Sequence, residues 1–294
     1  MRMFVESISA YAKTRSPGFI VIPQNGHALL TDDGTKTGTP VANYISAIDG
    51  VGREDLFYGF TGDDIATPEE DKNEMLGLMD VAKNNGLKVL ATDYCFSAAK
   101  VDDSYSQNES RGYISFAANH RGLDNIPQYP LSPRNVNTVN IDSLYKAKNF
   151  LYLIDPYGYE TKGYFIQAIS QTDFDVVIID MSYSDFENFD SLDIALMKQK
   201  ASGGTRKVIC YMSIGEAEDY RYYWKSYWKT NPPDFLVAEN PAWGGNYKVK
   251  YWDKNWQDII YGNNSSYLKK IMDAGFDGVY LDIIDAYEFF EDTN

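Results

Sequence analysis

The chain has 294 residues, 44% of them hydrophobic, which is enough for one large α/β domain with a substantial core. Its formal net charge of −15 disfavours nucleic acid as a partner, because phosphate binding requires a basic surface, and it favours a cationic ligand. Two histidines and two cysteines are too few for a His-rich metal centre or a disulfide framework, so we expect Cys95 and Cys210 to be buried free thiols.

Apolar runs of strand length alternate with segments of helical periodicity. The strands are predicted at residues 18–23, 45–49, 88–94, 149–154, 175–180, 207–213, 235–239 and 275–282. The helices are predicted at residues 3–14, 68–85, 161–171, 191–202, 219–229 and 255–273. Most of the strand segments are continuously apolar, which is typical of a parallel sheet covered by helices. The pattern predicts an α/β fold, a closed (β/α)8 TIM barrel, and the Gly-rich turn of an open nucleotide-binding sheet is missing from the sequence.

Residues 119–148 interrupt this alternation. Pro127, Pro130 and Pro133, together with several asparagines, indicate an extended linker. Three predicted strands precede the linker and five follow it, and neither set forms a closed layer alone. We therefore expect a single domain over residues 1–294, crossed by this linker.

The sequence contains no apolar run of the roughly 18 residues that a membrane-spanning helix needs. Residues 1–13 have an amphipathic helix pattern and lack the apolar stretch and cleavage site of a secretion signal. Either the protein stays inside the cell or a signal has been removed. We expect a monomer.

Acidic residues follow several predicted strands, at the end where the active site of a barrel lies. The last strand runs into Asp282 and Asp285, and further acids at strand ends are Glu54, Asp55, Asp93, Asp155, Asp180, Glu216, Glu218 and Asp219. For any one of them, the alternative is an ion pair or a hydrogen bond to a loop amide. Carboxylates converging from separate strands on one rim indicate an enzyme.

Six segments carry a resemblance to a known family. They are IPQNG (22–26), IDGVGREDLFY (48–58), KNFLYLI (148–154), SIGEAEDYR (213–221), ENPAWGGNYKVKYW (239–252) and FDGVYLDIIDAYEFF (276–290). Together they resemble the endo-α-1,4-polygalactosaminidases of glycoside hydrolase family 114, once mislabelled as relatives of cysteinyl-tRNA synthetase. The resemblance implies a TIM barrel, hydrolysis of a galactosamine-containing polysaccharide, and a secreted or extracytoplasmic protein. No synthetase nucleotide-binding motif is present in the sequence.

The chain departs from the family in two respects. The family's order begins near residue 149 and finishes near 118, so the sequence looks circularly permuted, with residues 119–148 bridging the usual ends. We then expect Met1 and Asn294 to lie near one another, at the loop between the strand at 275–282 and the helix at 3–14. In the fungal-type branch, a Glu thought to be catalytic stands where this chain has Tyr280, whereas Asp282 and Asp285 match.

Glycoside hydrolysis requires a proton donor and a second carboxylate on either side of the scissile bond. We predict that Asp282 pairs with one of three acids, Glu216, Glu218 or Asp219, and that Asp180 is an alternate second carboxylate. Residues expected to bind substrate are Asp285, Arg221, Tyr280, Tyr211, Glu54, Asp93, Trp243, Tyr247 and Trp252. Arg221 would hold one carboxylate ionised or form an ion pair at a helix start.

Four aromatic residues would stack on sugar faces or pack under loops: Trp224, Trp243, Trp252 and Tyr247. An acidic rim with aromatic faces would suit a protonated amino sugar, since each cation–π contact contributes about 0.5–2 kcal/mol. The alternative is a non-catalytic glycan-binding barrel whose activity was lost with the Tyr280 replacement. A lyase would need a Lys at a strand end, and a metal-dependent deacetylase would need more histidines. We expect no metal and no cofactor.

Overall fold

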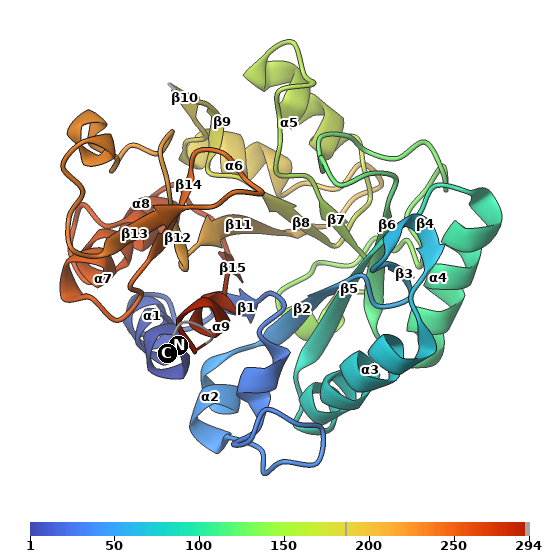
Figure 1. Cartoon of the computed structure of the whole chain (residues 1–294). Coiled ribbons are helices and arrows are strands. Elements are labelled where there is room, and N and C mark those ends of the chain that lie inside the picture. The colour runs from blue at the N-terminus through green and yellow to red at the C-terminus, as the bar shows by residue number, and fades with distance from the viewer. Residues whose placement is uncertain (186, 292–294) are drawn as a thin grey trace.

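The computed structural model describes residues 1–185 and 187–291 as a mixed α/β structure, with strands gathered at the centre and helices outside them (Figure 1). Its larger parallel sheet has the strand order β1(Ile20–Pro23), β15(Gly278–Asp282), β11(Lys207–Ser213), β8(Val176–Ile179), β7(Phe150–Tyr152). A second parallel sheet has the order β2(Gly50–Glu54), β5(Lys88–Tyr94), β6(Ile114–Ala118). A parallel bridge between Gln24 and Gly52 links β1 to β2, and β6 lies beside β7.

Seven of the eight predicted strands are confirmed, six of them in the parallel sheets, and β11 has the predicted bounds. The strand expected at 45–49 is wrong, because the helix α2(Ala42–Ala47) occupies that stretch and β2 begins at Gly50. The strand was hard to predict because glycine has a low strand propensity. Glycine is nevertheless required here, since a Cβ on Gly52 would lie 1.9 Å from the hydroxyl of Tyr280.

The predicted strand at 235–239 exists but does not join the parallel sheets. It is β13(Leu236–Glu239), which pairs in an antiparallel sheet of order β12-β14-β13 with β14(Asn246–Val249) and β12(Glu216–Glu218). Besides β2, the parallel strand that was not predicted is β6, a short segment in which all five residues are buried. Two further antiparallel pairs are β3(Tyr58–Gly59) with β4(Gly62–Ala66) and β9(Ser182–Ser184) with β10(Glu187–Asn188).

The helices at 3–14, 68–85 and 161–171 are confirmed as α1(Arg2–Arg15), α3(Glu69–Asn84) and α5(Lys162–Ser170), and the helix at 191–202 is shorter than expected, α6(Ser191–Met197). The segment 255–273 forms two helices, α7(Lys254–Ile260) and α8(Tyr267–Asp273), because the turn-forming residues 261–266 interrupt it. The helix at 219–229 is wrong. Successive turns there lead only to a 3-10 helix, η3(Ser226–Lys229). The helices α4(Ala98–Ser110) and α9(Ala286–Glu291) and the 3-10 helix η1(His27–Leu30) were not predicted.

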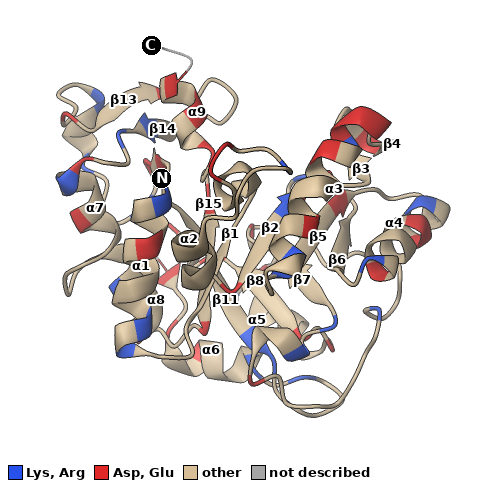
Figure 2. Ribbon diagram, turned by 90° about the horizontal axis from the view of Figure 1, so that it is seen from below, with Lys and Arg blue, Asp and Glu red and all other residues tan. Residues whose placement is uncertain are grey.

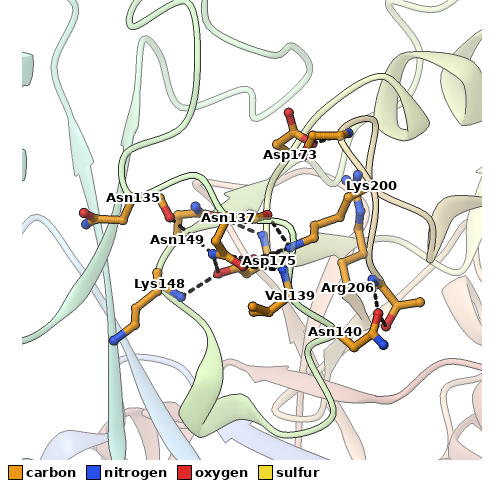
Figure 3. Close-up of polar contacts among 12 residues, drawn as sticks. Asn135, Asn137, Val139, Asn140, Lys148, Asn149, Asp173, Asp175, Lys200 and Arg206 are labelled. Carbon is orange, nitrogen blue, oxygen red and sulfur yellow. Dashed lines mark hydrogen bonds and ion pairs between the residues drawn. The ribbon is translucent and has the colours of Figure 1, made fainter.

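Residues 119–148 contain a single short 3-10 helix, η2(Leu144–Lys146), and are tied to the rest of the molecule by a buried polar network around Asp175 (Figure 3). Asp175 directly precedes β8 and forms an ion pair with Lys200 at 3.0 Å, and both side chains are fully buried. Asn137 of the linker donates to Asp175 over 3.0 Å and its carbonyl accepts from Lys200 over 2.7 Å. The network thus holds the linker at the amino-terminal end of the parallel strands.

The expected proximity of Met1 and Asn294 lies outside the described residues, because they end at Glu291. Burial lowers the pKa of the Met1 ammonium, and Glu291 is near enough for its charge to oppose that shift. Cys95 and Cys210 are both buried and free, as predicted. Within residues 1–185 and 187–291, no helix has the length and apolar character required to cross a membrane.

Candidate active site

Two carboxylates at the ends of β15 and β2 lie near enough for the charge of one to act on the other. Asp282 is the last residue of β15, and the Tyr211 hydroxyl on β11 donates to its Oδ2 over 2.6 Å. Burial raises the pKa of Asp282 to about 7, and the negative charge of Glu54, the last residue of β2, contributes to the rise. Asp282 therefore keeps its proton close to neutral pH beside a second acid.

Glu54 is held from both sides. Asn25, which follows β1, donates from Nδ2 to Oε2 of Glu54 over 2.8 Å, and Tyr94 at the end of β5 donates from its hydroxyl to Oε1. Asn25 has a φ of 58°, in the left-handed region that asparagine tolerates, and its Oδ1 accepts from the Glu54 amide over 3.1 Å. Three strand ends thus fix the orientation of this one carboxylate.

Tyrosines fill the interior below these acids. Tyr280 lies two residues before Asp282 on the same side of β15 and is fully buried, with its ring centroid 5.2 Å from that of Tyr152. Tyr152 donates to Gln24 over 2.9 Å, whereas the Tyr280 hydroxyl is buried with no hydrogen-bond partner. The structure places Tyr280 in the interior layer under the site, without surface open to a ligand.

Glu218 and Asp180, two of the predicted catalytic acids, share Arg221. The Arg221 guanidinium donates to both oxygens of Asp180 over 2.7 and 2.6 Å and from Nε to Glu218 over 2.6 Å. Burial by itself would lower the pKa of Arg221, but the two carboxylates raise it well above its usual value. Tyr220 also donates to Glu218 over 2.6 Å. Arg221 thus forms ion pairs with both of these acids.

The Arg221 cluster and Asp282 lie at the same end of the molecule. Burial raises the pKa of Tyr211 well above its usual value, and the charges of both Asp282 and Glu218 add to the rise, so both acids lie near Tyr211. In Figure 2 the β3–β4 and β13–β14 hairpins stand at this same end, and β4 carries acidic residues. The structure therefore brings Asp282, Glu54, Glu218 and Asp180 together.

Glu216 and Asp285 lie beside this group. Glu216 is fully buried, and its Oε1 contacts Lys248 at 2.6 Å and accepts from Asn240 over 2.8 Å, while its Oε2 has no hydrogen-bond partner. Burial raises the pKa of Asp285, with Lys248 opposing and Glu216 reinforcing that rise. Glu216 thus forms an ion pair with Lys248, and Asp285 lies close to both residues.

Two predicted site residues lie elsewhere. Asp219 forms an ion pair with Lys229 at 2.6 Å, and no contact of its carboxylate leads to Asp282 within the described residues. Asp93 is completely buried and accepts four hydrogen bonds, from the amides of Phe57 and Tyr58 and from the side chains of Ser104 and Asn108. Through these hydrogen bonds, Asp93 holds the loop after β2 against α4.

The aromatic residues expected to stack on a sugar lie in or beside the antiparallel sheet β12-β14-β13. Tyr247 pairs with Ala217 across the antiparallel sheet, and because side chains alternate along a strand it lies on the face opposite Glu216 and Glu218. Its ring packs on Trp224 with centroids 4.8 Å apart. Trp252 packs against Phe290, and Trp243, which is 61% exposed, lies in the β13–β14 loop. Stacking on a sugar by these rings stays a prediction.

Sequence reasoning missed Asn25, Tyr94 and Arg121. Asn25 lies inside the segment IPQNG and Tyr94 directly follows Asp93, so both are next to residues that the sequence analysis selected. Their hydrogen bonds to Glu54 join residues far apart in the chain and are visible only in the tertiary structure. Arg121 lies in the loop after β6, the strand that was not predicted. Among residues 1–185 and 187–291, no group of three or more His, Cys, Asp or Glu side chains is arranged to hold a metal ion.

Part of the chain, including several of these strand ends, matches a known family. Residues 157–294 match the model of glycoside-hydrolase family GH114. This part of the chain is therefore similar to family GH114, a family of glycoside hydrolases. The match includes β8, β11, β12 and β15, and therefore Asp180, Glu218 and Asp282.

Three curated relatives are similar to parts of the chain. The uncharacterized protein MJ1477 of Methanocaldococcus jannaschii is 39% identical over 182 residues, which is 62% of this chain and 50% of that protein. An uncharacterized protein of Thermotoga maritima is 43% identical over 124 residues (42% of this chain, 36% of that protein), and one of Deinococcus radiodurans is 35% identical over 144 residues (48% and 44%). The chain spans half or less of the length of these relatives.

Proposed function

We propose that the protein is a glycoside hydrolase that cleaves a galactosamine-containing polysaccharide with Asp282 as general acid and Glu54 as second carboxylate. The observation that carries this proposal is the raised pKa of Asp282, about 7, beside the anchored carboxylate of Glu54. Glycoside cleavage needs a proton donor and a second carboxylate near it. Glu54 thus takes the place that we expected Glu216, Glu218 or Asp219 to fill.

In this mechanism the proton of Asp282 passes to the glycosidic oxygen as its bond to the anomeric carbon breaks. The departing sugar leaves as an alcohol, and Asp282 becomes ionised with the Tyr211 hydroxyl bonded to its Oδ2. Glu54 either attacks the anomeric carbon or takes a proton from a water that attacks it. The hydrogen bonds from Asn25 and Tyr94 fix the direction of the Glu54 carboxylate.

The charge of the site supports an amino sugar as substrate. Arg221 is shared by Glu218 and Asp180, and Lys248 is held by Glu216, so these cations are already neutralised. Glu54 and Asp285, whose charges both act on Asp282, add carboxyl groups at the same end, on a chain with a formal charge of −15. A protonated amine on the sugar would be attracted to this end of the molecule.

The proposal includes the predicted architecture, a closed (β/α)8 barrel with circularly permuted strand order. The Gln24–Gly52 bridge between β1 and β2 and the position of β6 beside β7 support closure. The family match to residues 157–294 supports the assignment of the family's first strands to the second half of this chain. The linker 119–148 would then join the family's usual ends.

The test is hydrolysis of a galactosamine-rich polysaccharide, measured as new reducing ends. We expect the wild type to release them and both Asp282→Asn and Glu54→Gln to lose activity by about 10²–10⁴-fold, the usual contribution of a general acid or base. Asp273→Asn, at a surface pair with Lys269 on α8, serves as the control.

Two results would overturn the proposal. Full hydrolysis by Asp282→Asn would show that Asp282 is not the general acid. Binding of the polymer without cleavage by the wild type would favour the glycan-binding alternative, for which the specific observation is the buried Tyr280 at the position of the family's Glu.

A further inference from the structure

We infer that Arg121 is a positioning residue for the reaction, acting on Glu54 through the ring of Tyr94. The inference rests on the proposed role of Glu54 as the second carboxylate. Arg121 follows β6, whereas Glu54 ends β2, and β5 with Tyr94 at its end lies between them in the sheet. Arg121 thus reaches across the middle strand to the loop after the far one.

Arg121 is fixed by contacts with that loop. Its guanidinium donates to Oδ1 of Asp55 over 2.9 Å, to Oδ1 of Asp63 over 2.8 Å and to the Gly59 carbonyl over 2.7 Å. These acceptors all belong to residues 55–63, between β2 and the end of the β3–β4 hairpin. Because a planar guanidinium with three such acceptors has one orientation, its flat face is set as well.

That face lies on Tyr94. The guanidinium carbon is 4.2 Å from the centroid of the Tyr94 ring, within the range of a cation–π contact. The Tyr94 side chain is 2% exposed, and its hydroxyl donates to Oε1 of Glu54. The ring is therefore held on one side by Arg121 while its hydroxyl orients the carboxylate.

With a hydrogen bond from Asn25 alone, the Glu54 carboxylate would be held at Oε2 only and could still rotate. Since Asn25 bonds Oε2, the Tyr94 bond to Oε1 fixes the plane of the carboxylate. Reaction rates are sensitive to displacements of about 1 Å in a reacting group, so a small rotation of Tyr94 should lower turnover without preventing substrate binding. Arg121 itself has its donors occupied by Asp55, Asp63 and Gly59.

The experiment is a double-mutant cycle on the full chain with Arg121→Ala, Tyr94→Phe and the double variant, assayed on the galactosamine-rich polysaccharide. Each single change should lower kcat about tenfold or more with KM changed less than about twofold. In the Tyr94→Phe background, Arg121→Ala should lower kcat by no more than about twofold further, because both act through one bond.

Arg134→Ala is the matched control, because Arg134 also lies over a tyrosine, Tyr105, at 5.4 Å and pairs with an aspartate, Asp102, but in the linker. It should leave kcat unchanged. Additive losses in the cycle, or a raised KM with unchanged kcat for Arg121→Ala, would overturn the inference, the second result indicating direct contact with substrate.

A second readout does not depend on turnover. Crystal structures of Arg121→Ala should show the Tyr94 ring rotated and its bond to Glu54 lost, and Asn25→Ala should leave that bond in place. An unmoved Tyr94–Glu54 pair in Arg121→Ala would refute the inference even if the polysaccharide is not a substrate. Full activity of Glu54→Gln would instead refute the proposed function and leave this structural test standing.

Discussion

The hydroxyl of Tyr211 donates to Oδ2 of Asp282 over 2.6 Å, which joins the ends of two neighbouring parallel strands. The strand register pairs Ser213 with Asp282 and Tyr211 with Tyr280, so the long Tyr211 side chain spans the level between the interior tyrosines and the carboxylate. Because the bond favours the ionised form of Asp282, it limits a rise in pKa that burial and Glu54 produce. The pKa of Asp282 is thus set by burial and Glu54, which raise it, and by Tyr211, which lowers it.

Removing this bond should shift the pH profile. In Tyr211→Phe, the ionised form of Asp282 loses a donor, so its pKa should rise above about 7. The general acid then keeps its proton longer, and the alkaline limb of kcat/KM should move to higher pH. Tyr113→Phe, which removes a tyrosine–aspartate bond to Asp80 away from the site, is the control. A limb that moves to lower pH would contradict the assignment of Asp282.

The same group should make stability fall as pH rises. The pKa of Asp282 is about 7 in the folded protein and near 3.8 in the unfolded chain, so between these values the folded state binds more protons. Its contribution is therefore greatest below about pH 4 and is lost as pH rises through about 7. Between pH 5 and pH 8 the wild type should lose on the order of 2–3 kcal/mol relative to Asp282→Asn. Urea unfolding at both pH values measures this, and equal losses in the two proteins would speak against it.

Glu218 and Glu54 should respond differently to loss of charge. Glu218→Gln leaves Arg221 with only Asp180, and breaking a buried pair of this kind costs about 3 kcal/mol of unfolding free energy. Glu54→Gln should cost less stability and far more rate. The measurement is kcat per folded molecule with a parallel urea titration. A larger rate loss for Glu218→Gln than for Glu54→Gln would indicate that Glu218, and not Glu54, is the second carboxylate.

The buried pair under the linker should affect stability alone. Lys200→Met leaves Asp175 charged and buried without its partner, which should cost about 3–5 kcal/mol (Figure 3). The double variant Lys200→Met with Asp175→Leu should recover part of this loss, because it buries no unpaired charge. Since Asp175 precedes β8, at the end opposite Asp282, kcat per folded molecule should not change. A fall in kcat would show that the linker influences the site.

The strands could be predicted wherever an apolar run was continuous. Lys207–Ser213 was predicted to the residue, whereas Gly50–Glu54 was missed because its two glycines read as a turn. Those glycines are explained only by what packs on them, since Gly52 faces the Tyr280 hydroxyl. Helix 219–229 failed for a related reason. Its hydrophobic and polar pattern is helical, but turns there let Arg221 reach both Glu218 and Asp180.

The sequence by itself determined which segments form the parallel strands for the most part, and that acids stand at their ends, because both are properties of neighbouring residues. Only the tertiary structure decided which acids are neutralised and which keep a proton. Asp180 and Arg221 are 41 residues apart in the chain. Glu54 acts on the pKa of Asp282 although the two residues lie near opposite ends of the sequence. Charge pairing and loss of water depend on distance in space, and that distance is set by the order of strands around the sheets.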